Sequence, residues 1–144
     1  MLSAAGLPAT FSRDVEADIW AKLALAVMGP VSAVMRRSVV HIWAQPDARL
    51  LVRDMFDEVL AVAAAEGVEL DRDASWAHAM RTYEGTGDHT PSMCADVLAH
   101  RRTEIDAMAG EVARRGRLRG IPTPVHDTIV RAVRTIEATY RAAR

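Results

Sequence analysis

The chain has 144 residues, the size of one ordinary domain, and half of them are hydrophobic, which is enough for a core. Its 18 basic and 19 acidic residues give a formal charge of −1, which argues against a general binder of nucleic acid or anionic membranes. The single cysteine excludes an intrachain disulfide, and we find neither a secretory signal nor an apolar run approaching the roughly 20 residues that span a bilayer. We therefore expect a soluble, cytoplasmic protein.

The spacing of apolar residues predicts helices in the first half of the chain, after a lead-in over residues 1–12. Ser12 is placed to cap the first helix, Gly29-Pro30 breaks the chain after it, and Gly67 ends the longest helix of this half. The expected helices are 12–27, 31–43 and 46–65.

The second half is also predicted to be helical, with a threonine before three of its helices. The expected caps are Thr90, Thr103 and Thr123. The expected helices are 72–84, 91–100, 103–118 and 124–142. Gly110 lies inside a predicted helix, where it costs about 1 kcal/mol against alanine and so indicates close packing. Because we find no strand alternation, internal repeat or glycine-rich nucleotide-binding turn, we predict a single all-α domain over 1–144, with six or seven helices and no Rossmann domain.

Lys22 is the only lysine among the 18 basic residues, and it lies within 19–28, the most apolar stretch of the chain. On a helical wheel it falls at the margin of the apolar stripe. A partly buried ammonium loses hydration and is prepared to donate a proton, which makes Lys22 a candidate general acid. The structural alternative is an ordinary lysine that pairs with Asp18 four residues earlier.

Two further polar residues lie at predicted helix starts. Glu104 follows Thr103, so it either serves a capping-box-like start that ends at Asp106 or holds a lysine ammonium in place. Ser92 lies just after Thr90, where free backbone N–H groups attract anions, so it either caps the helix or binds a substrate carboxylate. From the residues alone, both interpretations stay open at each position.

Other residues with chemical potential give weaker signals. The five histidines have no metal-ligand spacing and Cys94 has no cysteine partner, so we expect no metal site. The arginine run over 114–119 has no interleaved aromatic residues, so it is read as a solvated helix end, with a phosphate contact as the alternative.

Read in order, several segments resemble the C-terminal domain of the ketopantoate reductase (2-dehydropantoate 2-reductase) family. The most distinctive is Ser-Met-x-x-Asp followed by Arg-x-Thr-Glu-Ile-Asp. The resemblance implies the helical fold of C-terminal domains in 6-phosphogluconate dehydrogenase-like proteins, and it covers nearly the whole chain. The segments that carry it are Asp18–Leu23, Met55–Val59, Ala65–Val68, Pro91–Asp96, Arg102–Asp106 with Gly110, and Gly120–Pro124.

The resemblance also implies an activity and residue roles. In the family, NADPH delivers a hydride to the C2 carbonyl of ketopantoate, and the product, pantoate, is used for coenzyme A synthesis. Lys22 matches the lysine that protonates the developing alkoxide, Glu104 matches the glutamate that orients this lysine, and Ser92 matches a serine that contacts substrate. No residue of this chain is assigned to NADPH.

Two departures from the family pattern affect these expectations. Ala26 and Gly29-Pro30 stand where family members place asparagines that anchor the hydroxylated keto acid, so pantoate recognition is expected to be weak. The nucleotide-binding half is absent from this chain, so we expect it to be inactive alone. One hypothesis is therefore a substrate-binding subunit completed by a separate Rossmann-type chain. The alternative is a non-enzymatic helical remnant that forms a homodimer or binds a protein partner.

Overall fold

The computed structural model describes residues 15–142, which form eight helices and no strand, as the all-α prediction requires. Two helices are shorter than eight residues. The helices are α1 Val15–Leu25, α2 Met28–Met35, α3 Val39–Trp43, α4 Pro46–Ala65, α5 Arg72–Gly85, α6 Ser92–Leu98, α7 Ala109–Arg119 and α8 Pro124–Ala142. The lead-in over 1–12 and the cap expected at Ser12 lie outside the described residues.

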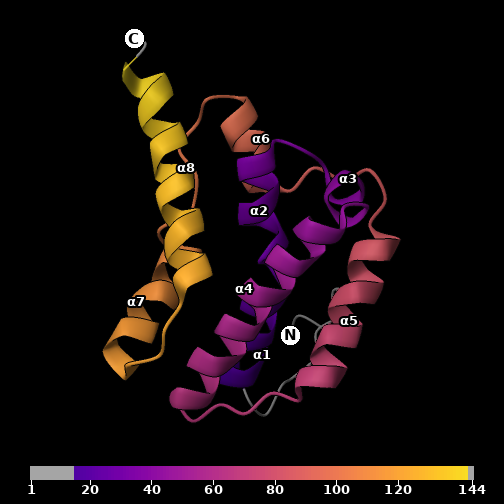
Figure 1. Ribbon diagram of the computed structural model, residues 1–144, viewed down its shortest axis with the longest axis vertical. Coiled ribbons are helices and arrows are strands. Elements are labelled where there is room, and N and C mark those ends of the chain that lie inside the picture. The colour runs from indigo at the N-terminus through magenta and orange to yellow at the C-terminus, as the bar shows by residue number, and fades with distance from the viewer. Residues whose placement is uncertain (1–14, 143–144) are drawn as a thin grey trace, which may run out of the picture.

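The long helix α4 is the centre of the fold. Figure 1 shows α7 and α8 on one side of α4 and α5 on the other, with α1 and α2 behind, and α4 contacts each of these helices. Its buried face includes Val52, Met55, Val59 and Val62, which recur at helical spacing. Pro46 starts the helix, and Gly67 follows its end with φ of 87°, so this prediction is confirmed at both ends.

The chain between α1 and α3 departs from the prediction. α1 already ends at Leu25, so Pro30 lies in the first turn of α2, where a missing N–H group leaves no helical hydrogen bond unmade. α2 then ends because Arg36 adopts the left-handed conformation, with φ of 54°. The helix predicted over 31–43 is therefore two short helices.

The stretch Val15–Met35 is long and apolar enough to cross a membrane by length and composition, contrary to the expectation that no such run exists. In the fold it is divided between α1 and α2 by a turn at residues 26–27. Much of it is core: Trp20, Ala24, Val27 and Val31 are buried. Burial within this domain accounts for the apolar character of these residues.

The prediction that a helix starts at Thr103 is wrong, because residues 103–108 form turns and α7 begins at Ala109. The close approach inferred for Gly110 is local: a Cβ there would meet the Ile105 carbonyl oxygen at 3.2 Å. Gly116 makes the tight contact between segments instead. A Cβ at Gly116 would lie 2.8 Å from the carbonyl oxygen of Ile121, just beyond the end of α7.

The start of α8 is stabilised by a residue of α4, not by Thr123. The buried Thr123 hydroxyl has no hydrogen-bond partner among the described residues, so the predicted cap is wrong. The Glu58 carboxylate instead accepts the backbone N–H groups of Val125 at 2.8 Å and His126 at 2.9 Å. The same carboxylate lies 2.6 Å from Nδ1 of His126, which is only 1% exposed. Glu58 thereby fixes α8 against α4.

Candidate functional site

Lys22 lies on the exposed face of α1, not at the margin of a buried stripe. The buried residues of this helix, Trp20 and Ala24, lie two positions to either side of Lys22, about 160° away around the helix. Val15 and Ile19 share the exposed face with Lys22, although their side chains are apolar and 63% and 54% exposed. Among the described residues no carboxylate is within 4.0 Å of the ammonium, so the expected pair with Asp18 is not formed.

A pocket with about 720 Å³ of empty space, part of it open to solvent, lies where α1, α2, α5 and α6 meet. Ser92, at the start of α6, lies on its lining. Pro91 precedes this helix at the cap position and makes no side-chain cap, so neither Thr90 nor Ser92 has the capping role that the sequence left open. Much of the wall is apolar. Its larger apolar side chains are Leu25, Met28, Val39, Met93 and Met108.

Most polar groups on this wall are already engaged. The Tyr83 hydroxyl donates to the Leu25 carbonyl at 2.7 Å, and burial raises the pKa of this phenol well above its ordinary value. Thr82 donates to a backbone carbonyl of its own helix, and so does Thr86. Within the described part of the chain, this leaves Ser92 and His89 as the lining side chains with hydrogen-bonding groups that have no partner.

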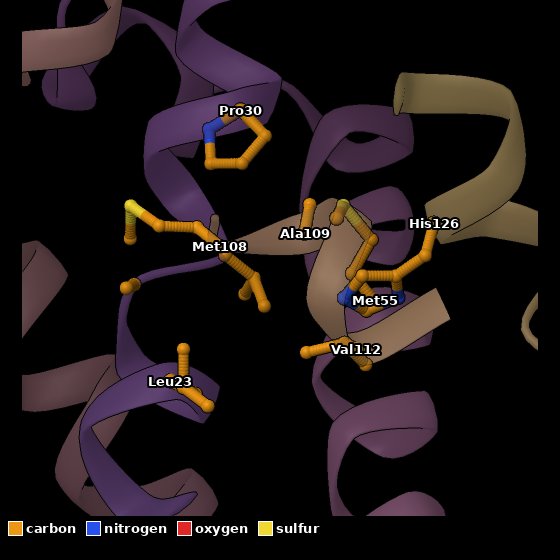
Figure 2. Close-up of a pocket in the computed structure, with 9 residues that line it drawn as sticks. Leu23, Pro30, Met55, Met108, Ala109, Val112 and His126 are labelled. Atoms are coloured by element: carbon orange, nitrogen blue, oxygen red, sulfur yellow. The ribbon is translucent and has the colours of Figure 1, made fainter. Parts of the chain in front are cut away.

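A second, smaller pocket, whose empty space of about 230 Å³ is partly open to solvent, lies between α1, α2, α4, α7 and α8. Figure 2 shows Leu23 and Pro30 across this space from Val112 and His126, with Met108 between them. Ala26 and Met108 line both pockets and so form the wall that the two share.

Lys22 and Glu104, the two predicted catalytic residues, each lie one turn of backbone before a residue of this shared wall. The N–H of Ala26 donates to the Lys22 carbonyl at 2.9 Å, and the N–H of Met108 donates to the Glu104 carbonyl at 3.1 Å. Neither Lys22 nor Glu104 lines the pocket on which Ser92 lies; the backbone of each lies one turn before a residue of its wall. Their two charged groups are not within 4.0 Å of each other in this structure.

Glu104 is exposed and belongs to the turn over 103–108, so the predicted capping box is not formed. Helix α8 holds this turn on both sides of Glu104. Glu137 accepts the N–H and the hydroxyl of Thr103, both at 2.7 Å. Arg134 donates from Nε to Asp106 at 2.8 Å and from Nη2 at 2.7 Å.

Sequence reasoning missed His89 and Glu137. His89 directly precedes the Thr90–Met93 segment, so its place in the sequence beside Ser92 was an available signal. Glu137 had none, because it lies 34 residues from Thr103 and on a regular helix.

The arginine run over 114–119 is paired with carboxylates. Glu111 accepts hydrogen bonds from Arg114 and Arg115, which lower the pKa of its carboxyl to about 2. Glu66 binds Arg119 and Arg115, and these contacts lower its pKa too. These pairs support the interpretation as a solvated helix end rather than a phosphate site. In residues 15–142, no group of three or more histidine, cysteine or acidic side chains is placed to hold a metal ion.

Comparison with known proteins gives one consistent result. Residues 14–137 match the family described as ketopantoate reductase PanE/ApbA, C terminal. The 2-dehydropantoate 2-reductase of Streptococcus pyogenes serotype M3 is 33% identical over 140 residues, which are 96% of this chain and 46% of the relative.

Solved structures of similar proteins give the same result as the sequence comparison. D-mandelate dehydrogenase, in a ternary structure with NADH and anilino(oxo)acetate, is 31% identical with a TM-score of 0.90 over 96% of this chain and 58% of its own. The PanE/ApbA family ketopantoate reductase of Ralstonia eutropha JMP134 is 32% identical with a TM-score of 0.89, over 96% of this chain and 47% of its own.

The fold and the matched segments define the all-helical, C-terminal type of domain found in a class of oxidoreductases. The chain belongs to the ketopantoate reductase family. It spans about half the length of the curated relatives that it matches.

Proposed function

We propose that this chain is the substrate-binding and catalytic C-terminal domain of a reductase that uses NADPH or NADH to reduce a 2-oxo acid. The observation that supports the proposal is one pocket and the backbone that leads to its wall. Ser92 lies on its lining, while Lys22 and Glu104 each lie one turn before a residue of its wall. The structural roles that the sequence left open for them, an ion pair with Asp18 and two helix caps, are not formed among the described residues.

Each of the three residues has a defined task in this proposal. The Lys22 ammonium donates a proton to the carbonyl oxygen as C2 becomes tetrahedral, which turns the ketone into a secondary alcohol. The Glu104 carboxylate holds this ammonium in place, and the Ser92 hydroxyl donates a hydrogen bond to the substrate carboxylate. A reduced nicotinamide dinucleotide supplies the hydride.

The dinucleotide does not fit the described residues as a binding site of their own. Phosphates of such cofactors bind at a glycine-rich turn between a strand and a helix, and residues 15–142 contain no strand. We therefore propose that a nucleotide-binding domain outside residues 15–142 covers Lys22. The exposed Val15 and Ile19 beside Lys22 support this, because a domain packed on them would bury apolar surface and exclude water from the ammonium.

The pocket favours a 2-oxo acid with an apolar side chain. Its unengaged polar side chains, Ser92 and His89, suffice for one carboxylate, whereas the walls are largely apolar. Ala26 gives this wall a methyl group where the family resemblance predicts an asparagine. D-mandelate dehydrogenase was solved with anilino(oxo)acetate, a 2-oxo acid derivative that carries an aromatic ring. We therefore propose phenylglyoxylate as a better ligand than ketopantoate.

The proposal can be tested by NMR of protein labelled with ¹³C-lysine. Because Lys22 is the only lysine, the lysine signals come from this one side chain. Titration with phenylglyoxylate is expected to move the Lys22 Cε signal saturably, and ketopantoate is expected to bind about tenfold more weakly. Ser92→Ala should weaken binding about tenfold, whereas the control Ser75→Ala, on α5, should not. A Lys22 signal that neither acid moves at millimolar concentration would refute the proposal.

A further inference from the structure

We infer that Glu137 is a positioning residue, which acts with Arg134 to hold the turn that carries Glu104. The inference rests on the proposed function, because it concerns how the carboxylate that orients Lys22 is itself placed. Neither Glu137 nor Arg134 contacts the pockets described above. Their effect on the site therefore passes through the turn over 103–108.

The first contact fixes the residues on either side of Glu104. Glu137 is 9% exposed, and its Oε1 accepts two hydrogen bonds of 2.7 Å from the backbone N–H and hydroxyl of Thr103. The Thr103 hydroxyl oxygen in turn accepts the N–H of Ile105 at 3.2 Å. Hydrogen bonds to a buried carboxylate are strong because water does not compete for them. The backbone on both sides of Glu104 is therefore tied to one carboxylate of α8.

The second contact fixes the far end of the same short segment. Arg134 lies three residues before Glu137 and hence on the same face of α8. Its guanidinium binds Asp106 through two nitrogens, at 2.8 Å and 2.7 Å. The Ile105 side chain, 1% exposed, anchors the turn in the core between these contacts. By contrast, Glu104 makes no side-chain hydrogen bond or ion pair with a described residue, so its carboxylate stays available.

Local structure alone does not place Glu104. Residues 103–108 are not helical, and the Glu104 N–H, unlike the Glu104 carbonyl, makes no backbone hydrogen bond among the described residues. α8 supplies the remaining constraints, and α8 is itself fixed to α4 by Glu58. The position of Glu104 relative to Lys22 on α1 is thus set through α8 and α4.

Thr103 offers a matched pair of variants. Thr103→Val keeps the shape of the side chain but loses the hydroxyl that joins Glu137 to Ile105, whereas Thr103→Ser keeps it. The first readout is hydrogen exchange of the amides of residue 103 and Ile105, which donate to Glu137 and to the Thr103 hydroxyl. The second readout is the change that Glu104→Gln causes in the Lys22 Cε signal, measured in the parent chain and in each variant. A contact that only stabilises the fold would leave this change unaltered.

We expect Thr103→Val to speed exchange of the Ile105 amide, and Glu137→Gln that of the Thr103 amide, at least tenfold. Both variants should reduce the Glu104-dependent change at Lys22 by half or more. Thr103→Ser should behave like the parent. The inference is overturned if Thr103→Val and Glu137→Gln alter neither the exchange nor the Glu104-dependent change while the fold is retained. If Glu104→Gln has no effect on Lys22 in the parent, the proposed role of Glu104 fails, and the exchange rates still decide whether Glu137 positions the turn.

Discussion

At the scale of single residues, Glu58 is the side chain whose loss should harm the fold most directly. Its carboxylate accepts two backbone N–H groups of α8 and contacts the buried His126 ring. Glu58→Gln removes the charge and turns an acceptor oxygen into an N–H₂ group facing donors. We expect a loss of about 2–4 kcal/mol in the free energy of unfolding, measured by urea denaturation. The exposed Glu69→Gln is the control, and equal stability of the two variants would contradict this account.

The lowered pKa of the Glu111 carboxyl should make the stability of the fold depend on pH. Hydrogen bonds from Arg114 and Arg115 lower the pKa of its carboxyl from 4.5 to about 2 in the folded state. A depressed folded-state pKa stabilises the fold above the unfolded value, and this contribution is lost as the pH falls from about 4.5 toward 2. Urea denaturation of Glu111→Gln should therefore show a smaller loss of stability over this range than the parent chain. Equal acid sensitivity of the two chains would be evidence against the ion-pair account.

The candidate residues differ in how far the sequence could identify them. Lys22 is marked by its uniqueness, but Glu104 and Ser92 became candidates over capping residues only through the family resemblance. The helical wheel placed Lys22 at the edge of the core because it assumed that Val15 and Ile19 are buried, whereas both are exposed. Apolar residues that another domain covers cannot be told from core residues by periodicity within one chain.

At the scale of elements, Gly116 determines how α7 turns back into α8. A Cβ there would lie 2.8 Å from the Ile121 carbonyl oxygen and 2.9 Å from Thr123 Cγ2. Gly116→Ala should therefore cost about 1–3 kcal/mol of stability, although alanine favours helix. Gly85, in α5, is the matched control because its added Cβ meets nothing within 4 Å. A thermal melt should show a lower midpoint for Gly116→Ala alone, and equal midpoints for both variants would disprove this packing.

Helices were predictable where both ends carry a local signal, and less so where distant residues decide. Pro46 and Gly67 delimit α4, and the structure follows them. The Thr103–Asp106 segment has the appearance of a capping box, but the side chains of Thr103 and Asp106 form hydrogen bonds with α8 instead. Arg36 divides the predicted 31–43 helix because its backbone is left-handed. Glycine and asparagine are the residues that usually mark this conformation in a sequence, and neither stands here. Contacts that link residues 28 and 34 positions apart leave no trace in local spacing.

At the scale of the whole molecule, the exposed face of α1 predicts association. Val15 and Ile19 are too exposed to belong to the core of this domain, and a homodimer or a complex with a nucleotide-binding chain would cover them. Light scattering at micromolar concentration is therefore expected to show a mass above that of one chain, or to do so when the partner is added. Ile19→Asp should abolish this association. Leu118→Asp is the control, because Leu118 is 70% exposed but lies on α7.

The same measurement separates the two functions considered for this chain. An association that Ile19→Asp abolishes, in a protein that binds no 2-oxo acid, would favour a non-enzymatic interaction module. A strictly monomeric chain under all conditions would contradict both that module and a covered α1 face.

The central claim is that Lys22 is a general acid which another domain completes. The most direct test combines this chain with the part of the Streptococcus pyogenes relative that it does not match, and follows NADPH oxidation with phenylglyoxylate or ketopantoate. We predict oxidation that requires both components and falls about 100-fold or more in Lys22→Gln. Oxidation that persists in Lys22→Gln, or a stable complex that oxidises no NADPH with either acid, would contradict the account.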